Sequence, residues 1–200
     1  MHLKQGVQRI SFVVFFLLCL PLSGCGDAAK PEDAVREMRT LYQNAESVSG
    51  VADITADYGQ RVYTYTAAVE GTASAGTLTV QAPENIAGTV IQWAEDATAL
   101  TYEETTLETG TLSESSLSPA DAIPAVLASC RAGALVECAW EEDGGVLYAA
   151  LENPEDESVT VSCWFDAENY VLQRTELAED GTTVLTLVFS DFGITLVAQE

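Results

Sequence analysis

The chain has 200 residues, 48% of them hydrophobic, which is enough for one domain with a single core and argues against disorder. It carries 31 acidic and eight basic residues, a formal net charge of −23. Nucleic acids and anionic lipid head groups repel so acidic a surface. Composition therefore excludes proteins that bind either of them through charge, and we expect no nucleic-acid partner.

Residues 1–24 have the organisation of a secretory signal peptide. Lys4 and Arg9 come before an apolar run at residues 10–20, about half the ~20 residues that a membrane-spanning helix needs. The segment Leu22-Ser23-Gly24-Cys25 then resembles the lipobox of bacterial lipoproteins, whose cysteine receives a diacylglyceryl group. It predicts cleavage before Cys25, an acyl anchor on that residue, and a place on the extracytoplasmic face of the cell membrane. A plain secretory signal and an uncleaved anchor are the alternatives.

Residues 25–31 would form the lipidated cysteine and a short tether, with one domain following at residues 32–200. The signal peptide removes two basic residues and no acidic one, so six basic and 31 acidic residues remain, a net charge of −25. Attachment to the membrane must therefore depend on the acyl anchor and not on charge.

Three further cysteines follow: Cys130, Cys138 and Cys163. Outside the cytoplasm a disulfide is permitted, and an odd number of cysteines allows at most one intrachain pair. Cys130 and Cys138 could close a short loop, Cys138 and Cys163 could join neighbouring strands, or all three could be buried free thiols. None of the pairs has the spacing of a zinc or redox motif.

The first predicted element is a helix that opens at Pro31-Glu32-Asp33, with acids at the positive end of its dipole. Apolar residues recur at helical spacing along one stripe: Val35, Met38, Leu41, Tyr42 and Ala45. We expect Ser47 to Gly50 to end this helix.

Alternation with a period of two then predicts antiparallel strands joined by short turns. The predicted strands of the first half are residues 51–58, 61–70, 76–81, 86–93 and 99–106, with a short one at 110–112.

A serine-rich segment separates the two halves and leads into a second predicted helix. Ser118 is its expected N-cap, Pro119 its first residue and Asp121 its third. Its apolar face would carry Ile123, Val126, Leu127 and Cys130. After Gly133, strands are predicted at 135–141, 146–152, 159–166, 170–178 and 182–190, separated by turns rich in Asp, Asn and Gly.

Three stretches of this pattern resemble the LolA/LolB-like lipoprotein-carrier superfamily and its GerS-like germination lipoproteins. They are VREMRTLYQNAESVSGVADITADY, GTLTVQAPENIAGTVI and VSCWFDAENYVLQRTEL. The resemblance covers residues 32–192. It implies an α+β fold in which a strongly curved antiparallel sheet of about 10–11 strands forms an open half-barrel covered by two or more helices. It also implies a cavity for acyl chains. The chain departs from the family at Ala82, before Pro83, where lipoprotein carriers often have a basic residue.

Candidate residues for such a cavity come from the predicted helices and the aromatic strands. They are Val35, Met38, Leu41, Tyr63, Tyr65, Trp93, Ile123, Leu127 and Trp164. A filled core needs the same residue types as a lined cavity, so core packing is the alternative for each.

Catalytic motifs are weak in this sequence, and we expect no enzyme, no cofactor and no metal. The single histidine, His2, lies in the predicted signal peptide, which excludes histidine-dependent nucleophilic catalysis and histidine metal sites in the processed protein. The acidic turns lack the spacing of an EF-hand loop.

Two functions remain. The first is a membrane-anchored lipoprotein that binds a lipid or acyl chain in an apolar cavity. The second is a scaffold without catalytic activity that binds and regulates an enzyme of the cell envelope or of sporulation and germination.

Overall fold

The structure is a computed structural model that describes residues 30–94, 97–102, 105–110 and 117–197. Two helices, α2 (Pro31–Gln43) and α3 (Pro119–Ala132), accompany one 3₁₀ turn, η1 (Glu142–Gly144), within these residues. The strands of the first half are β1 (Ala45–Asp57), β2 (Val62–Gly71), β3 (Gly76–Ala82), β4 (Val90–Ala94), β5 (Ala97–Tyr102) and β6 (Thr105–Gly110). Those of the second half are β7 (Leu135–Glu141), β8 (Val146–Asn153), β9 (Asp156–Asp166), β10 (Leu172–Glu179) and β11 (Thr182–Leu196).

The described strands form one antiparallel sheet in the order β6-β5-β4-β3-β2-β1-β11-β10-β9-β8-β7. Each half of the chain is a meander, and the pairing of β1 with β11 joins the halves in the centre, with Ile54 opposite Leu187. β6 and β7 are the two edges of this sheet, so among the described residues it is not closed into a barrel. The predicted α+β fold with an open, curved antiparallel sheet is confirmed.

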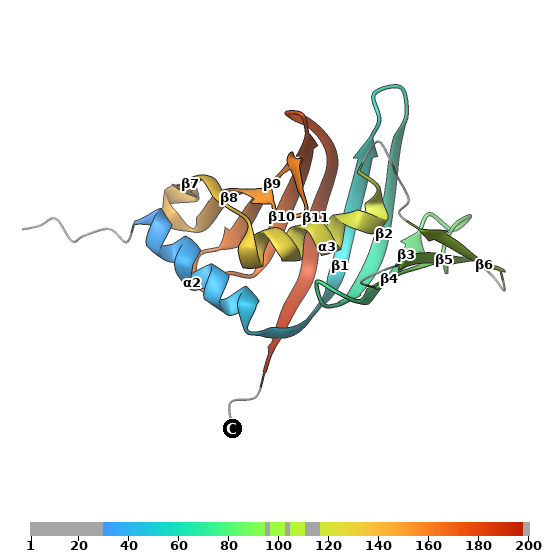
Figure 1. Cartoon of the computed structure of the whole chain (residues 1–200), viewed down its shortest axis with the longest axis horizontal. Helices are drawn as coiled ribbons and strands as arrows, with labels where there is room; N and C mark the ends of the chain where they lie inside the picture. The colour runs from blue at the N-terminus through green and yellow to red at the C-terminus, as the bar shows by residue number, and fades with distance from the viewer. Residues whose placement is uncertain (1–29, 95–96, 103–104, 111–116, 198–200) are drawn as a thin grey trace, which may run out of the picture. The chain divides into compact units, whose positions relative to one another are not determined.

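Both helices lie on the same face of the sheet (Figure 1). In sequence α3 falls between the two edge strands, and it packs against β4 from one half and against β8 and β9 from the other. α2 packs beside α3 and against β7 and β8. The helices thus cover the opening that the unclosed sheet leaves.

The predicted apolar stripe of α2 is confirmed for Val35, Met38 and Tyr42, which are buried, whereas Leu41 is half-buried and Ala45 belongs to β1. The predicted end of this helix is wrong. It ends at Gln43, where the amide of Asn44 donates to the carbonyls of Thr40 and Leu41. Strand β1 then begins at Ala45, because Ala45 and residues 47–49 already pair with β11. The register shifts twice in this segment, between Ala45 and Ser47 and between Ser49 and Val51.

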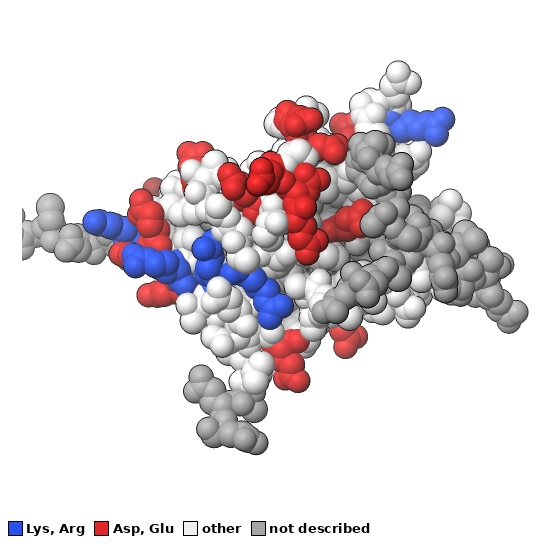
Figure 2. Space-filling view, in the orientation of Figure 1, with Lys and Arg blue, Asp and Glu red and all other residues white. Residues whose placement is uncertain are grey.

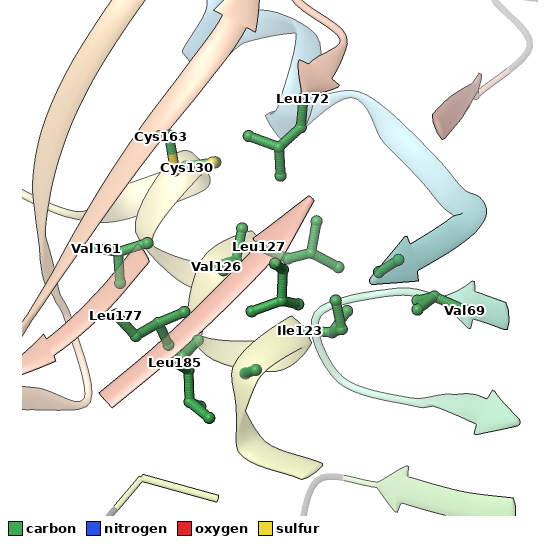
Figure 3. Packing of buried hydrophobic residues seen from close by; sticks show 14 of the residues in the cluster. Val69, Ile123, Val126, Leu127, Cys130, Val161, Cys163, Leu172, Leu177 and Leu185 are labelled. Carbon is green, nitrogen blue, oxygen red and sulfur yellow. The ribbon is translucent and has the colours of Figure 1, made fainter. Parts of the chain in front are cut away.

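α3 begins as predicted, with Ser118 as N-cap and Pro119 at the first position. Its apolar face is fully buried and meets residues of the central strands (Figure 3). Leu127, for example, borders the same small space as Val48 of β1 and Gly71 of β2. This contact between helix and sheet forms the centre of the core.

Two strand predictions in the first half are wrong. The strand predicted at 86–93 begins only at Val90, because residues 83–89 form consecutive turns in which Ile86 N donates to Pro83 O and Thr89 N to Ile86 O. The single strand predicted at 99–106 is a hairpin of β5 and β6 in which Tyr102 pairs with Thr105. Part of the short strand predicted at 110–112 lies outside the described residues.

Basic side chains are unevenly placed on this acidic protein. Figure 2 shows a row of Lys and Arg on the helical face with acidic residues around it. Arg36 and Arg39 belong to α2, and Arg131 to the last turn of α3. Arg39 donates to Gly133 O, and Gln43 Nε2 donates to Arg131 O at 2.8 Å. Part of the row therefore fastens the two helices to each other.

Candidate functional site

An apolar cavity of about 480 Å³ lies between the start of α3 and strands β2 to β5. It is within the range of ~300–1,000 Å³ that is typical of small-molecule pockets. The residues that line it are Tyr65, Val80, Asn85, Ile86, Thr89, Ile91, Leu100, Ser118, Pro119 and Ala120. Ile86 is 37% exposed, which places it at the mouth, while Val80 and Ala120 are buried.

The cavity exists because the side chains of α3 that face the sheet differ in size along the helix. The middle and end of the helix carry Ile123, Val126 and Leu127, which occupy the space above the central strands. Its first turn lines the cavity with only Pro119 and Ala120, whose short side chains leave room above β3 and β4. The turns at residues 83–89 form the opposite wall.

The cavity wall contains no ionisable carboxylate or basic side chain among its described lining residues. Its polar groups are the hydroxyls of Tyr65, Ser118 and Thr89 and the amide of Asn85. Ser118 Oγ donates to Asp121 Oδ2 and Thr89 Oγ1 to Ile86 O, so both hydroxyls are already engaged. The site can therefore hold an uncharged, largely apolar group.

Tyr65 differs from the other polar groups because its hydroxyl is buried and has no hydrogen-bond partner among the described residues. Burial raises the pKa of Tyr65 well above its ordinary value, with a smaller contribution from nearby Tyr58. The hydroxyl therefore stays neutral and can both donate and accept a hydrogen bond. An unpaired buried hydroxyl costs ~1–3 kcal/mol. The Tyr65 oxygen exposes less than 1 Å² of surface, so a bound oxygen or nitrogen atom recovers this cost only where the cavity wall shifts to admit it.

Most of the residues predicted to line a cavity fill the core instead. Val35, Met38, Ile123 and Leu127 are buried against the sheet, and Leu127 borders only a space of about 10 Å³. Trp93 is also buried, and its indole Nε1 donates to Thr72 O at 3.1 Å. Of the nine candidates, Tyr65 lines the 480 Å³ cavity.

Trp164 lies on the face of the sheet opposite the helices. Its neighbours in β9, Cys163 and Phe165, are fully buried on the helical side, and successive side chains of a strand point to opposite faces. There Trp164 contacts Tyr148 with ring centroids 5.1 Å apart and donates from Nε1 to Glu141. The structure therefore does not place it in the cavity.

Tyr63 shares the helical face with Tyr65 but lies nearer the start of β2, where it is 48% exposed and contacts Tyr58.

Leu41 borders a second cavity, of about 570 Å³, between the end of α2, the β9–β10 turn and Leu196 and Val197. That cavity is more polar, and in it Tyr170 Oη donates to Glu37 Oε2 at 2.9 Å. Leu41 and Tyr65 therefore belong to different sites.

Sequence reasoning missed the wall formed by Asn85, Ile86, Thr89 and Leu100. The local pattern of residues 82–89 predicts a turn and the start of a strand at residue 86, and nothing in it marks the wall of a cavity. The one feature of the sequence that indicates the cavity is the pair of short side chains, Pro119 and Ala120, at the start of a helix face that is otherwise bulky.

All three described cysteines are free thiols in the structure, so the possible pairing of Cys130 with Cys138 stays a prediction. Cys130 instead meets Cys163 (Figure 3). Cys25, the predicted lipidation site, lies outside the described residues.

Among the described residues, no group of histidine, cysteine and acidic side chains is arranged to hold a metal ion. Within the same residues, neither helix combines the length and the apolar character that crossing a bilayer requires.

No family model matches the sequence, and no curated protein does. Solved structures match at the level of the fold. A DUF1329 family protein from Desulfovibrio piger has a TM-score of 0.50 and 10% identity, over 84% of this chain and 93% of that one. A LolA superfamily protein from Nitrosomonas europaea has a TM-score of 0.45 and 12% identity, over 86% of this chain and 96% of that one. A third match is to the structure of the CwlD amidase from Clostridioides difficile in complex with the GerS lipoprotein, with a TM-score of 0.42 and 14% identity, over 82% and 96%. The predicted resemblance to LolA-like carriers is confirmed for the fold alone.

Proposed function

We propose that this protein is a lipoprotein, anchored through Cys25 on the extracytoplasmic face of the membrane, that binds an acyl chain in the 480 Å³ cavity without catalysing a reaction. The observation that carries the proposal is an apolar cavity whose wall includes Tyr65, with a buried hydroxyl that has no hydrogen-bond partner among the described residues. An acyl chain matches the apolar wall, and an oxygen atom at its head matches the hydroxyl.

Burial of methylene groups supplies the binding free energy. Each buried methylene contributes ~0.8 kcal/mol, so ten of them contribute ~8 kcal/mol. This offsets the several kcal/mol that association costs in lost freedom of motion.

The chemistry of the wall selects an uncharged head group. A buried carboxylate needs a cation or several donors, and the described lining residues offer only hydroxyl and amide groups. The acidic surface also repels an anion as it approaches. We therefore expect an acyl ester or amide to bind more tightly than a free fatty acid.

Native mass spectrometry of the full-length protein, purified from membranes in a non-ionic detergent, tests this proposal. Monopalmitoylglycerol should give a one-to-one adduct at concentrations at which palmitate does not. Equal binding of the two would contradict the choice of an uncharged head, and binding of neither would contradict the function.

Filling the cavity provides the matched variant. Ala120→Phe places a ring in the space at the start of α3 and should abolish the adduct. Ala128→Phe makes the same change two turns later at a half-buried position that borders none of the cavities described above, and it should keep the adduct. Loss of the adduct in both variants would show that the effect is not specific to the cavity.

The acyl anchor has its own test. Cells grown with an alkyne-tagged palmitate should yield labelled protein in the membrane fraction. Cys25→Ala should abolish the label, whereas Cys19→Ala, inside the predicted signal peptide, should not. Retention of the label in Cys25→Ala would refute the predicted lipidation site.

One observation favours the second candidate, a scaffold for an envelope enzyme. Edge strand β7 carries Leu135 and Val136, which are 38% and 58% exposed, beside a sheet edge that is unpaired among the described residues. A partner that added a strand there would cover both side chains. Val136→Lys should then abolish a cross-link to a membrane protein and leave the lipid adduct intact.

A further inference from the structure

We propose that Cys130 and Cys163 form a disulfide in the exported protein and thereby fix α3 to the sheet. The two thiols come from different elements, α3 and β9, and lie close together in the core (Figure 3). Both side chains are fully buried. The inference rests on the export that the proposed function includes, because a disulfide persists in an oxidising compartment.

The hydrogen bonds around the two thiols are compatible with the oxidised state. Cys163 Sγ lies 3.6 Å from Thr175 Oγ1, and Thr175 Oγ1 donates to Ser162 O at 3.0 Å. With the threonine proton committed to Ser162, the Cys163 thiol is the donor to Thr175. Loss of both thiol protons therefore leaves the Thr175 hydroxyl bonded to Ser162 O and creates no unpaired buried donor.

Cys138 is the thiol that stays free. It lies on edge strand β7, half-buried, where its pKa is raised by partial burial and by the nearby carboxylates of Glu32 and Glu137. Of the three cysteines it is thus the one beside the surface, and it provides an internal standard for chemical labelling.

Formation of the bond requires an external disulfide as oxidant, such as the disulfide of an envelope oxidoreductase. One cysteine thiolate attacks that disulfide, forms a mixed disulfide and expels a thiolate. The second cysteine then attacks the first sulfur and expels the other thiolate. Two protons and two electrons leave the protein, and the oxidant becomes a dithiol.

This exchange belongs to the folding chain and not to the folded domain. A hydrogen bond to Cys163 and burial raise the pKa of Cys130 well above its ordinary value, which keeps the thiol protonated. Folded, reduced protein should therefore oxidise slowly, and the folded disulfide should resist reductant until the domain is unfolded.

The bond would hold the end of α3 in place while its first turn borders the cavity. It closes a loop of about 33 residues, a length for which restriction of the unfolded chain raises the melting temperature by roughly 10 °C. α3 would then be a fixed wall of the cavity and not a mobile cover.

Labelling of the full-length protein tests the pairing. Membranes are dissolved in denaturant with N-ethylmaleimide and without reductant, and the digest is analysed by mass spectrometry. We expect a linked peptide pair that contains Cys130 and Cys163, lighter by two hydrogens than the separate peptides, and a maleimide on Cys138. A maleimide on all three residues, or a link that includes Cys138, would overturn the proposal.

A refolding experiment separates this inference from export. Purified chain is unfolded under reducing conditions and refolded with glutathione disulfide, which should produce the Cys130–Cys163 link and a melting temperature roughly 10 °C above that of protein refolded with reductant. Cys138→Ala should behave in the same way, and Cys163→Ala should show no difference between the two conditions. Absence of the Cys130–Cys163 link in the refolded protein would refute the proposed pairing. Recovery of the protein from the cytosol alone would refute export and leave the pairing untouched.

Discussion

At the scale of single residues, the hydroxyl of Tyr65 links stability to binding. It is buried beside the cavity and has no hydrogen-bond partner among the described residues, so it destabilises the empty protein. A ligand atom that reaches it after a small shift of the wall would remove this cost. Such a group is costly in a structure that binds nothing. Its retention inside an apolar wall is the residue-level argument for a ligand that carries a polar atom.

Tyr65→Phe should raise the melting temperature of the unliganded protein by about 2–4 °C, because it removes ~1 kcal/mol of unpaired polar burial. The same change should weaken binding of monopalmitoylglycerol by about threefold to tenfold through loss of one hydrogen bond. Thermal unfolding and native mass spectrometry measure the two effects.

Tyr63→Phe is the matched control, on the same strand and face but 48% exposed, and should change neither quantity. A lower melting temperature in Tyr65→Phe would mean that the hydroxyl is already satisfied in the empty protein.

At the scale of elements, the junction from α3 to β7 joins both helices to the sheet. Gly133 N donates to Ser129 O at the end of α3, Arg39 of α2 donates to Gly133 O, and Glu152 N of β8 donates to Ala134 O. Hydrogen bonds to the backbone of Gly133 and Ala134 thus connect both helices to strand β8.

Gly133→Ala should destabilise the protein by ~1–3 kcal/mol, the usual cost of an overpacked site. A Cβ atom at this position would lie 2.3 Å from Glu152 O and 2.8 Å from Ser129 O, so backbone would have to move. The free energy of unfolding in urea measures the loss.

Gly145→Ala is the comparison, since its nearest neighbour would be Glu142 O at 3.3 Å. It should change stability by less than about 0.5 kcal/mol. Equal losses in the two variants would mean that the close contacts of Gly133 are not what limits this position, because its backbone, with φ −61° and ψ 142°, is open to any residue.

At the scale of the whole molecule, buried tyrosines couple stability to alkaline pH. Burial raises the pKa of Tyr42 well above its ordinary value of 10.0, and burial also raises the pKa of Tyr65. The folded state then binds more protons than the unfolded state above pH 10.0, so stability is complete below that pH and falls as pH rises beyond it.

The free energy of unfolding, measured between about pH 8 and pH 11 at constant ionic strength, should be level at first and then fall steeply. Tyr42→Phe removes one of the responsible groups and should flatten the fall, although it also loses the hydrogen bond from Tyr42 Oη to Tyr170 O. A fall of equal slope in the variant would show that Tyr42 is not responsible.

Local pattern was sufficient for the types of the elements. The stripe Val35–Met38–Tyr42 predicted α2, and Ser118-Pro119 predicted the start of α3, because capping and helical spacing depend on neighbours in sequence. The ends of elements were less predictable. β1 begins at Ala45 because β11 pairs with it there, and that partner lies about 150 residues away in the chain.

The sequence by itself determined the helices, the meandering strands and the apolar face of each, since these follow from periodicity over a few residues. The tertiary structure decided that Trp164 points away from the helices, that Cys130 meets Cys163, and that the cavity lies under the first turn of α3. A cavity is the volume left when side chains from distant segments fail to fill the space between them. Filled and empty regions use the same apolar residues, so only their arrangement in three dimensions distinguishes them.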